Sequence, residues 1–318
     1  MSATGTADTL VVVNPASAGG RTLRHWPASH DLLRALGMEF EVHFTTAPAD
    51  ATDAVRAALR TGIRRVVSVG GDGTLNEVVN GFFAEGGEPL GDDAVLGIVP
   101  SGSGGDFRRA AGIPPATAAA VRLLASGATR RVDVGRIDFG DRSRRFFINV
   151  ADCGIGGDVV ARVNGNRYKG GGTRGSAVFL WESLATLLRY GSRDVRVVVD
   201  GAAVERAVQS VVVANGRYFG GGMRIAPHAR IDDGVFDVVI VDAMSRGRAI
   251  MSMPSLYRGT HVRRRGVGVL HGRVVHIEHR GTPLLFDVEG EQVGATPATI
   301  TCLPAAIRLC ARTNTTSR

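Results

Sequence analysis

Residues 65–83 read RVVSVGGDGTLNEVVNGFF, and this stretch decides how the first part of the chain folds. Its opening run, residues 66–69, is almost continuously apolar, as expected of a parallel strand that is covered on both faces. A glycine-rich turn follows, and apolar residues then recur at helical spacing over residues 75–83. The stretch therefore predicts a strand, a sharp turn and a helix in direct succession.

The same alternation of short apolar runs and longer amphipathic stretches covers the first third of the chain. Four runs predict strands, at residues 10–13, 39–45, 65–69 and 94–99. Between the second and third of these strands, residues 48–60 predict a helix that begins at a proline and places Val55 and Leu59 four residues apart. Strands that alternate with helices in this way favour an open α/β sheet.

The pattern changes after about Arg131, where β-branched runs are separated by Gly and Asp turns. These runs predict strands at residues 146–150, 195–199, 208–214, 235–241 and 274–278. They are not separated by regular crossover helices. One helical exception is expected at residues 177–188, where several leucines share one side.

The fold class that we expect is therefore α/β plus β-rich. An N-terminal open α/β domain occupies residues 1–132, and a β-sandwich-like second domain occupies residues 133–303. We expect residues 304–318 to form a tail that returns to the first domain. A length of 318 residues with 44% apolar residues suits two such cores.

The composition excludes several classes of protein. Residues 1–10 lack a basic stretch followed by an apolar one, and no apolar run is long enough to span a bilayer, so a soluble cytoplasmic protein is expected. Three cysteines match neither a zinc site nor a redox pair and are expected to be buried thiols. The net charge of +8 suits nucleic acid, anionic membranes or phosphate-rich substrates. With 6% aromatic residues and no RNP-like pattern, nucleic acid is the least favoured of the three.

The turn Gly70-Gly71-Asp72-Gly73-Thr74 carries the strongest chemical signal, because it lies between a strand and a helix. Glycines let the backbone approach a ligand closely, and the amide groups at a helix start favour phosphate. Asp72 could hold a nucleotide's Mg²⁺ or a phosphate-bound water, and the Thr74 hydroxyl could bond a phosphate oxygen or cap the helix. The alternative is a glycine turn with a capping residue and no ligand.

Two further loops follow predicted strands. Residues 100–106, Pro-Ser-Gly-Ser-Gly-Gly-Asp, form a second glycine loop, and residues 14–21, Asn-Pro-Ala-Ser-Ala-Gly-Gly-Arg, end on a cation. Loops at the carboxyl ends of neighbouring parallel strands converge on one crevice, so the three loops support one another. Taken singly, the second loop could be a plain connection and Arg21 a solvated side chain.

These motifs resemble the diacylglycerol kinase catalytic-domain family, which includes bacterial lipid kinases and the sphingosine and ceramide kinases. The Asp72 turn alone is similar to that of NAD kinases and phosphofructokinases, but the continuation over residues 75–81, Leu-Asn-Glu-Val-Val-Asn-Gly, resembles the lipid kinases. Four later segments also resemble the family, at residues 215–223, 227–239, 257–262 and 289–291. The resemblance runs almost end to end.

The resemblance implies that ATP and Mg²⁺ bind to the loops of the first domain and that the acceptor lipid lies in a cleft between the domains. It implies catalytic roles for Asp72 and for Glu291, which matches the presumed general base. Without the resemblance, Glu289 and Glu291 would be solvated carboxylates. The residues expected to bind the nucleotide are Asn14, Pro15, Arg21, Gly70, Gly71, Asp72, Gly73, Thr74, Asn76, Glu77, Gly102, Ser103, Gly104 and Asp106.

The family also has an acidic second-domain loop that can bind a structural magnesium ion, and residues 231–237 resemble it. The resemblance implies Asp232, Asp233 and Asp237 as ligands, because carboxylate oxygens suit Mg²⁺. The alternative is a β-turn in which Asp and Gly satisfy the turn geometry without a metal.

The chain departs from the family pattern at several positions, Arg21 among them. Ser103 replaces a threonine and keeps the hydroxyl, whereas Gly105 replaces an asparagine and removes an amide that could bond ATP. Glu289 replaces an aspartate, and the longer side chain could shift the acceptor site. Asp72 and Glu291 are both retained, so we expect an active enzyme.

The partner that we expect is a lipid substrate at the membrane surface, and the acceptor is diacylglycerol or a related lipid. Whether the chain forms a homodimer is left open. Arginines at 258, 263–265, 273 and 280 could attract an anionic leaflet or could form an ordinary solvated face. Two other functions stay open: a soluble-substrate kinase of the NAD kinase type, and a lipid- or nucleotide-binding regulator without turnover, which Gly105 and Arg21 would suit.

Overall fold

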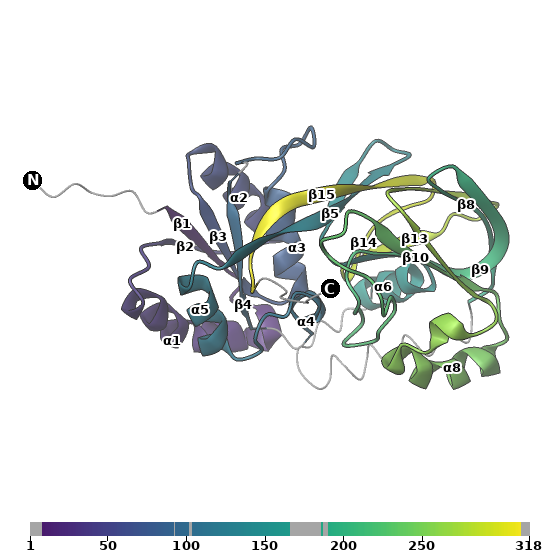
Figure 1. The fold of residues 1–318 in the computed structure, drawn as a ribbon, viewed down its shortest axis with the longest axis horizontal. Helices are drawn as coiled ribbons and strands as arrows, with labels where there is room; N and C mark the ends of the chain where they lie inside the picture. Colours follow the sequence, from purple (N-terminus) through teal and green to yellow (C-terminus); the bar gives the residue numbers. More distant parts are fainter. Residues whose placement is uncertain (1–7, 92, 102–103, 166–185, 187–189, 313–318) are drawn as a thin grey trace, which may run out of the picture. The chain divides into compact units, whose positions relative to one another are not determined.

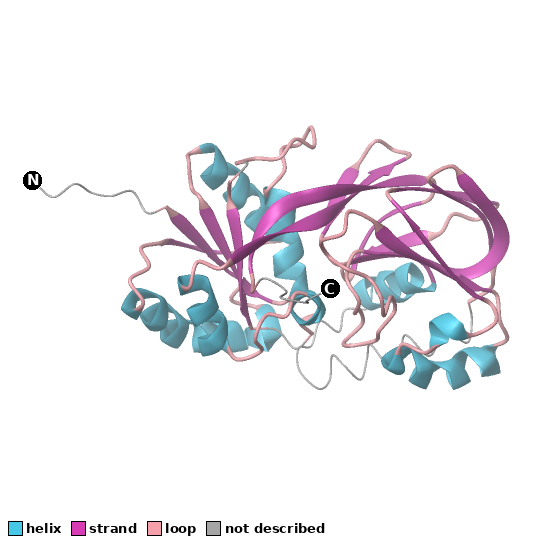
Figure 2. Cartoon of the chain, viewed as in Figure 1, coloured by secondary structure: helices cyan, strands magenta, loops and turns pink. Residues whose placement is uncertain are grey.

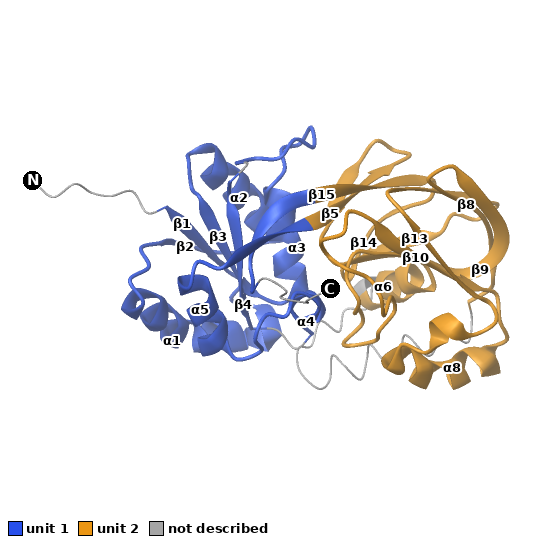
Figure 3. Cartoon of the chain, viewed as in Figure 1, with its two compact units in different colours: residues 1–132, 305–318 blue, residues 133–304 orange. Residues whose placement is uncertain are grey.

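The protein is described by a computed structural model that covers residues 8–91, 93–101, 104–165, 186 and 190–312. The chain forms two compact units, shown in Figure 3. Unit 1 comprises residues 1–132 and 305–318, and unit 2 comprises residues 133–304. Two long strands, β5 (Thr129–Phe139) and β15 (Ala298–Cys310), carry the chain from one unit to the other. The predicted helix at residues 177–188 falls outside the described residues, Thr186 excepted.

Unit 1 is built on a parallel sheet whose strands alternate with helices (Figures 1 and 2). Its strand order is β2-β1-β3-β4, and the end of β15 pairs with β4. The four strands are β1 (Thr9–Val13), β2 (Glu41–Phe44), β3 (Arg65–Gly70) and β4 (Val95–Pro100). The open α/β sheet that was expected in the first third of the chain is therefore present.

Helices cover both faces of this sheet. Val11 and Val13 of β1, with Val67 and Val69 of β3, pack in one apolar cluster with residues of α1 (Arg21–Ala35) and α5 (Thr117–Ala125). Helices α2 (Asp50–Arg60) and α3 (Asp72–Gly81) pack against each other, and they contact β1 and β3 respectively. The short elements η1 (Ser17–Gly20) and α4 (Asp106–Ala110) follow β1 and β4. Burial on both faces explains why β1, β3 and β4 are almost entirely apolar, whereas the edge strand β2 is partly exposed and contains Glu41 and His43.

Unit 2 is mainly antiparallel, as the β-branched runs predict. The hydrogen-bonded strands follow one another in the order β14-β13-β7-β9-β8-β12-β15. Strands β10 and β11 extend from β9, and β5 pairs with β6 and β15. The 13-residue β9 bonds to β8 with its first half and to β7 with its second half, while β10 lies on its other edge. The strands are β6 (Arg144–Phe147), β7 (Val150–Gly154), β8 (Arg193–Val199), β9 (Ala202–Ala214), β10 (Phe236–Asp242), β11 (Val267–Gly272), β12 (Val274–Arg280), β13 (Leu285–Val288) and β14 (Glu291–Ala295).

The main core of unit 2 is a large cluster, chiefly of Val, Ile and Phe side chains, from strands throughout the unit. It includes the stacked rings of Phe147 and Phe236. Alternate residues of each strand enter the core, as in β8, where Val195, Val197 and Val199 are buried. The α/β plus β-rich fold class is thus confirmed.

Two features of unit 2 differ from the sequence prediction. The run at residues 146–150 is not one strand, because the amide groups of Ile148 and Asn149 donate to the Glu289 carboxylate rather than to a neighbouring strand. In addition, the unit contains the helices α6 (Ile155–Gly165) and α8 (Arg246–Arg258) and the short helix η2 (His261–Arg263), for which no helix was predicted.

Two further predictions concern the cysteines, which lie on β7 and β15, and the absence of a membrane span. Cys153, Cys302 and Cys310 are buried free thiols, as expected, and burial raises the pKa of all three. In the part of the chain that the structure describes, no helix is long and apolar enough to cross a bilayer.

Candidate active site

The turn between β3 and α3 is held by a contact between two predicted site residues. Asn14, which follows β1, donates from Nδ2 to Thr74 Oγ1 at 3.0 Å, and its own Oδ1 accepts from the Ala16 and Ser17 amides. A Cβ atom at Gly70 would lie 2.5 Å from Thr74 Oγ1, so only glycine fits there. Thr74 therefore connects the first loop to the turn. Among the described residues, no side chain caps this end of α3, so Thr74 is not a cap.

Asp72 joins the turn to the second glycine loop. Its Oδ2 accepts a hydrogen bond from the Gly105 amide at 2.8 Å and another from the Asp106 amide at 3.3 Å. A Cβ atom at Gly104 would lie 2.7 Å from the same oxygen, so the close approach of this loop requires glycine. The loops start side by side, because Gly70 and Pro100 are partners in the β3–β4 ladder. The two loops therefore converge as the sheet topology predicts.

A cavity of about 270 Å³ lies over this junction, entirely within unit 1. Gly70, Gly71, Asp72 and Gly104, all predicted to bind nucleotide, line it. Its other lining residues are Ser68, Leu75, Ile98, Pro100, Gly105, Arg108, Arg109 and Pro115. The cavity thus combines glycine backbone, one carboxylate and two cations.

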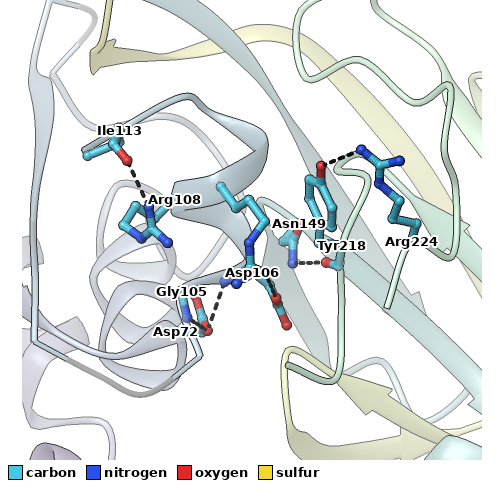
Figure 4. A network of polar contacts seen from close by, with 9 residues as sticks. Asp72, Gly105, Asp106, Arg108, Ile113, Asn149, Tyr218 and Arg224 are labelled. Carbon is cyan, nitrogen blue, oxygen red and sulfur yellow. Dashed lines mark hydrogen bonds and ion pairs between the residues drawn. The ribbon is translucent and has the colours of Figure 1, made fainter. Parts of the chain in front are cut away.

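The two cations come from α4, directly after the second loop (Figure 4). Arg108 donates to the Ile113 carbonyl at 3.0 Å, and Arg109 pairs with Asp106 at 2.6 Å. Burial lowers the pKa of Arg108, as does Arg109, while the Asp72 and Asp106 carboxylates oppose the change. An arginine stays charged under such a shift. The cavity is therefore electropositive on one side, which suits phosphate.

Neither arginine was predicted from the sequence. They could have been found from the position of Arg108-Arg109 immediately beyond a predicted phosphate loop, where a helical turn directs side chains back over the loop.

Several predicted nucleotide-binding residues do not line this cavity. Arg21 is exposed and its Nε donates to the Ala18 carbonyl of its own loop. Asn76 is buried, and its side-chain oxygen accepts a hydrogen bond from the Asn80 side-chain amide. The backbone carbonyl of Glu77 accepts a hydrogen bond from the Thr52 hydroxyl. The remaining predicted residues that do not line the cavity are Asn14, Pro15, Gly73, Thr74 and Asp106, while Gly102 and Ser103 are outside the described residues. The nucleotide-binding roles of all these residues stay predictions.

In unit 2, Glu291 begins β14 directly after a two-residue hairpin turn. Glu289 and Gly290 form the turn with φ of 56° and 92°, and Val288 pairs with Glu291 across it. The Asp287 carboxylate accepts the Gly290 amide at 2.7 Å. Glu291 is half-buried. The Val288–Glu291 pairing and the Asp287–Gly290 hydrogen bond hold this short hairpin, so Glu291 has a well-defined position.

Glu289 is not a solvated carboxylate. Its Oε1 accepts the Ile148 amide at 2.6 Å and the Asn149 amide at 2.8 Å. Asn149 then donates from Nδ2 to the Tyr218 carbonyl at 2.9 Å, a contact drawn in Figure 4 together with Arg224, whose guanidinium lies 3.4 Å from the Tyr218 hydroxyl. Glu289 therefore connects the hairpin to the 215–223 segment that carries part of the family resemblance.

A pair of acidic residues lies behind the hairpin. Asp152 of β7 faces Asp287 of β13, and Ser210 of β9 donates to Asp152. Burial raises the pKa of Asp152 to about 7 and that of Asp287 to about 6, and the charge of Glu291 contributes to the second shift. The sequence analysis missed this pair, because its members are 135 positions apart and only the strand pairing brings them together.

The acidic loop does not assemble the predicted metal ligands. Asp232 lies 3.4 Å from the Arg230 guanidinium, Asp233 accepts the Val235 amide, and Asp237 pairs with His271 at 3.2 Å. Among the described residues, no group of three or more His, Cys, Asp or Glu side chains is placed to hold a metal ion. The side-chain geometry fits a turn better than a metal site.

Two family models match the chain. Residues 8–137 match the diacylglycerol kinase catalytic domain, and residues 149–311 match the YegS C-terminal NAD kinase beta sandwich-like domain. An α/β unit followed by an antiparallel unit is thus the architecture of a kinase family. The chain belongs to the diacylglycerol kinase family of lipid kinases, and the resemblance drawn from the sequence motifs is confirmed.

Individual relatives agree with this assignment. A "Diacylglycerol kinase" of Mycobacterium tuberculosis is 29% identical over 302 residues, which cover 94% of this chain and 93% of the relative. A "Probable lipid kinase YegS-like" of Xanthomonas euvesicatoria is 30% identical and covers 94% of each chain. A crystal structure of a diacylglycerol kinase from Bacillus anthracis shares the fold, with a TM-score of 0.71, 21% identity and 98% of each chain covered.

Proposed function

We propose that this lipid kinase transfers the γ-phosphoryl group of ATP to the hydroxyl of diacylglycerol or a related membrane lipid. The observation that carries the nucleotide part is the cavity in which Asp72 joins two glycine loops beside Arg108 and Arg109. The family assignment supports the reaction class and ATP as donor. That the acceptor lies between the two domains remains a prediction from the sequence.

The described residues of unit 1 suit a polyphosphate. The cavity is bordered by backbone amides at the start of the ten-residue α3 and by the cations of Arg108 and Arg109. Each of these groups stabilises a bound negative charge. Arg109 already pairs with Asp106, so Arg108 is the cation whose contact is to a neutral carbonyl. In the proposal, Arg108 bonds the phosphates and stabilises the charge that grows on the leaving oxygen.

Magnesium is part of the proposal on the nucleotide side only. Asp72 fits such a role, because its carboxylate lines the cavity while one of its oxygens is held by two backbone amides. Mg²⁺ bound with ATP would neutralise phosphate charge. Asp232, Asp233 and Asp237 are paired elsewhere and do not fit a shared ion, so no structural role for magnesium in that loop is proposed.

On the acceptor side, Glu291 is proposed as the general base. The lipid hydroxyl oxygen forms a bond to the γ-phosphorus, the bond from that phosphorus to the β–γ bridging oxygen breaks, and ADP leaves with the electron pair. The hydroxyl proton passes to Glu291. Glu289 contributes by holding the 148–149 backbone, so its role is to position the hairpin rather than to accept the proton.

An NAD kinase-type activity is the second enzyme reading, and it rests on the Asp72 turn alone. The relatives named as lipid kinases span the whole chain, including the second unit, and so favour the lipid acceptor. The reading as a regulator without turnover is opposed by the retained Asp72 and Glu291.

The test is transfer of labelled γ-phosphate from Mg²⁺-ATP to a panel of micelle-dispersed lipids, with NAD as a soluble acceptor. Asp72→Asn and Glu291→Gln keep side-chain size, and Asp31→Asn, at a side chain 82% exposed, is the matched control. The proposal expects a labelled lipid with the native protein and the control, and a loss of at least about 100-fold with each of the other variants. Labelling of NAD alone would select the second reading, and ATP binding without transfer to any acceptor would select the regulator.

A further inference from the structure

Helix α8 presents apolar side chains to solvent. The large hydrophobic residues exposed in the described part of the chain include three on this 13-residue helix, Ile250 at 41%, Met251 at 78% and Tyr257 at 53%. Pro254 is also exposed. At 100° per residue, these four positions fall within about 120° of the helix circumference. An outward apolar stripe reverses the usual orientation of a surface helix and marks an interaction surface.

The opposite side of α8 fixes its orientation. Ala249 and Ser255 are buried, and Leu256 packs against the apolar cluster that includes Val150 and Val239. The Leu256 carbonyl also accepts the Arg224 amide at 2.9 Å. Because the inner face is packed in this way, the exposed stripe cannot turn inward without loss of these contacts. Figure 1 shows α8 at the periphery of unit 2.

The charge around the stripe is of one sign. From residue 243 to residue 277 the chain has no Asp or Glu. The same segment contains seven arginines, Arg246, Arg248, Arg258, Arg263, Arg264, Arg265 and Arg273. The first six are exposed, and three of them lie on α8 itself beside the stripe. An apolar stripe on a segment that carries cations and no carboxylate matches a surface that offers anionic groups above an apolar layer.

We propose that α8 and Arg263-Arg264-Arg265, together called the α8 surface, dock on an anionic lipid bilayer. Met251 and Ile250 enter the apolar boundary while the arginines bind lipid phosphates. A second copy of this chain is a poorer occupant, because two α8 surfaces would bring arginines against arginines. This inference deepens the proposed function by assigning the surface through which the enzyme reaches a membrane-borne acceptor.

The experiment is flotation of the full chain with vesicles, without ATP or acceptor lipid, so that its result does not depend on turnover. Vesicles of pure phosphatidylcholine are compared with vesicles containing phosphatidylglycerol. Two variants remove the two parts of the surface: Ile250→Asp with Met251→Asp, and the triple change of Arg263, Arg264 and Arg265 to Gln. All five side chains are exposed, so the fold is expected to be retained.

Matched controls separate the surface from general effects. Leu23→Asp with Leu36→Asp changes two apolar residues of unit 1 that are 50% and 39% exposed. A triple change of Arg24, Arg60 and Arg122 to Gln lowers the net charge by the same amount as the α8 triple change, at exposed positions of unit 1. Each arginine near a bilayer strengthens binding about fivefold, so the α8 triple variant is expected to bind about 100-fold more weakly. The apolar double variant should lose at least about tenfold.

The proposal expects native protein and both controls to bind phosphatidylglycerol vesicles, and the two α8 variants to be released. Equal binding to both kinds of vesicle, equal losses with the unit 1 controls, or unchanged binding of the α8 variants would each overturn it. Sedimentation of the native chain as a dimer that the Ile250 and Met251 changes dissociate would also overturn it and assign the surface to a second copy. Kinase activity on a short-chain, monomeric acceptor reports separately on the proposed function and should be unchanged in the α8 variants.

Discussion

Asp152 and Asp287 lie directly opposite each other on the antiparallel strands β7 and β13, on the side of the sheet that α6 covers. Asp152 accepts from Ser210, and Asp287 accepts the Gly290 amide of the turn that precedes Glu291. Asp152 is buried and Asp287 is half-buried, and two carboxylates that face each other in such a setting cannot both be ionised at low cost. Protonation of this pair is therefore coupled, through the contact of Asp287 with the Gly290 amide, to the hairpin that carries the proposed base Glu291.

The first prediction concerns how stability depends on pH. The pKa of Asp152 is raised from 3.8 to about 7, chiefly by burial, and Asp287 adds to the shift. The folded state thus binds more protons than the unfolded state between about pH 4 and 7, and this contribution to the free energy of unfolding falls as pH rises through that window. Asp152→Asn keeps the acceptor for Ser210 and removes the charge. At pH 8 it should stabilise the protein by on the order of 2 kcal/mol.

Urea unfolding of native and Asp152→Asn protein from pH 5 to pH 8 tests this. The variant should show a smaller loss of stability towards high pH, whereas Asp31→Asn, at an exposed position, should follow the native curve. The charge of Glu291 acts on Asp287, and burial together with the charges of Asp158 and Asp152 raises the pKa of Tyr190, so these neighbouring groups are left unchanged in the comparison. Parallel curves for native and Asp152→Asn protein would contradict the assignment.

A second prediction concerns Glu289, which the sequence pattern leaves as a carboxylate of uncertain role. Glu289→Ala leaves the Ile148 and Asn149 amides without their acceptor, so the free energy of unfolding should fall by about 2–4 kcal/mol. Glu289→Gln keeps an acceptor oxygen and should cost less than half as much. Chemical denaturation measures both changes. Equal stability of the alanine variant and native protein would show that this anchor is unimportant.

The sequence predicted the strands and turns of unit 1 more fully than those of unit 2. The strands, the glycine turns and the position of Asp72 follow from local patterns, because periodicity and glycine placement are local properties of a chain. The contact from Asp72 to the Gly105 amide spans 33 positions and could be expected only because neighbouring parallel strands end at one edge. Arg108 and Arg109 directly follow the second glycine loop, so their position was also a local signal.

The second unit was less predictable for a physical reason. Its site depends on cross-strand neighbours, such as Glu289 with Ile148 at a separation of 141 positions. No local pattern records which strands pair, so the split of the run at residues 146–150 and the Asp152–Asp287 pair were out of reach. Helix α8 was missed because its apolar stripe faces outward, and Gly247 and Pro254 weaken its helical pattern.

A third prediction assigns phosphate binding to Arg108. Arg108→Gln removes the cation that contacts a neutral carbonyl beside the cavity, and the KM for ATP should rise by about 10- to 100-fold. Arg122→Gln, on the exposed side of α5, is a control of equal charge change. Initial-rate kinetics at varied ATP and fixed lipid measure the effect. A variant with a native KM for ATP would remove Arg108 from the nucleotide site.

The last prediction restores the amide that Gly105 lacks relative to the family pattern. Gly105 has φ of +69°, a conformation that asparagine tolerates better than other side chains, and an added Cβ would meet the flexible Arg108 side chain at 2.9 Å. If that amide bonds ATP in the family, Gly105→Asn should lower the KM for ATP by about 2- to 12-fold, the equivalent of one hydrogen bond. Gly105→Ala meets the same φ and the same arginine without an amide, so it should lower stability by about 1 kcal/mol and give no gain in affinity. Improvement in both variants would assign the effect to the arginine's displacement, whereas improvement in neither would show that this chain binds nucleotide without a side chain at position 105.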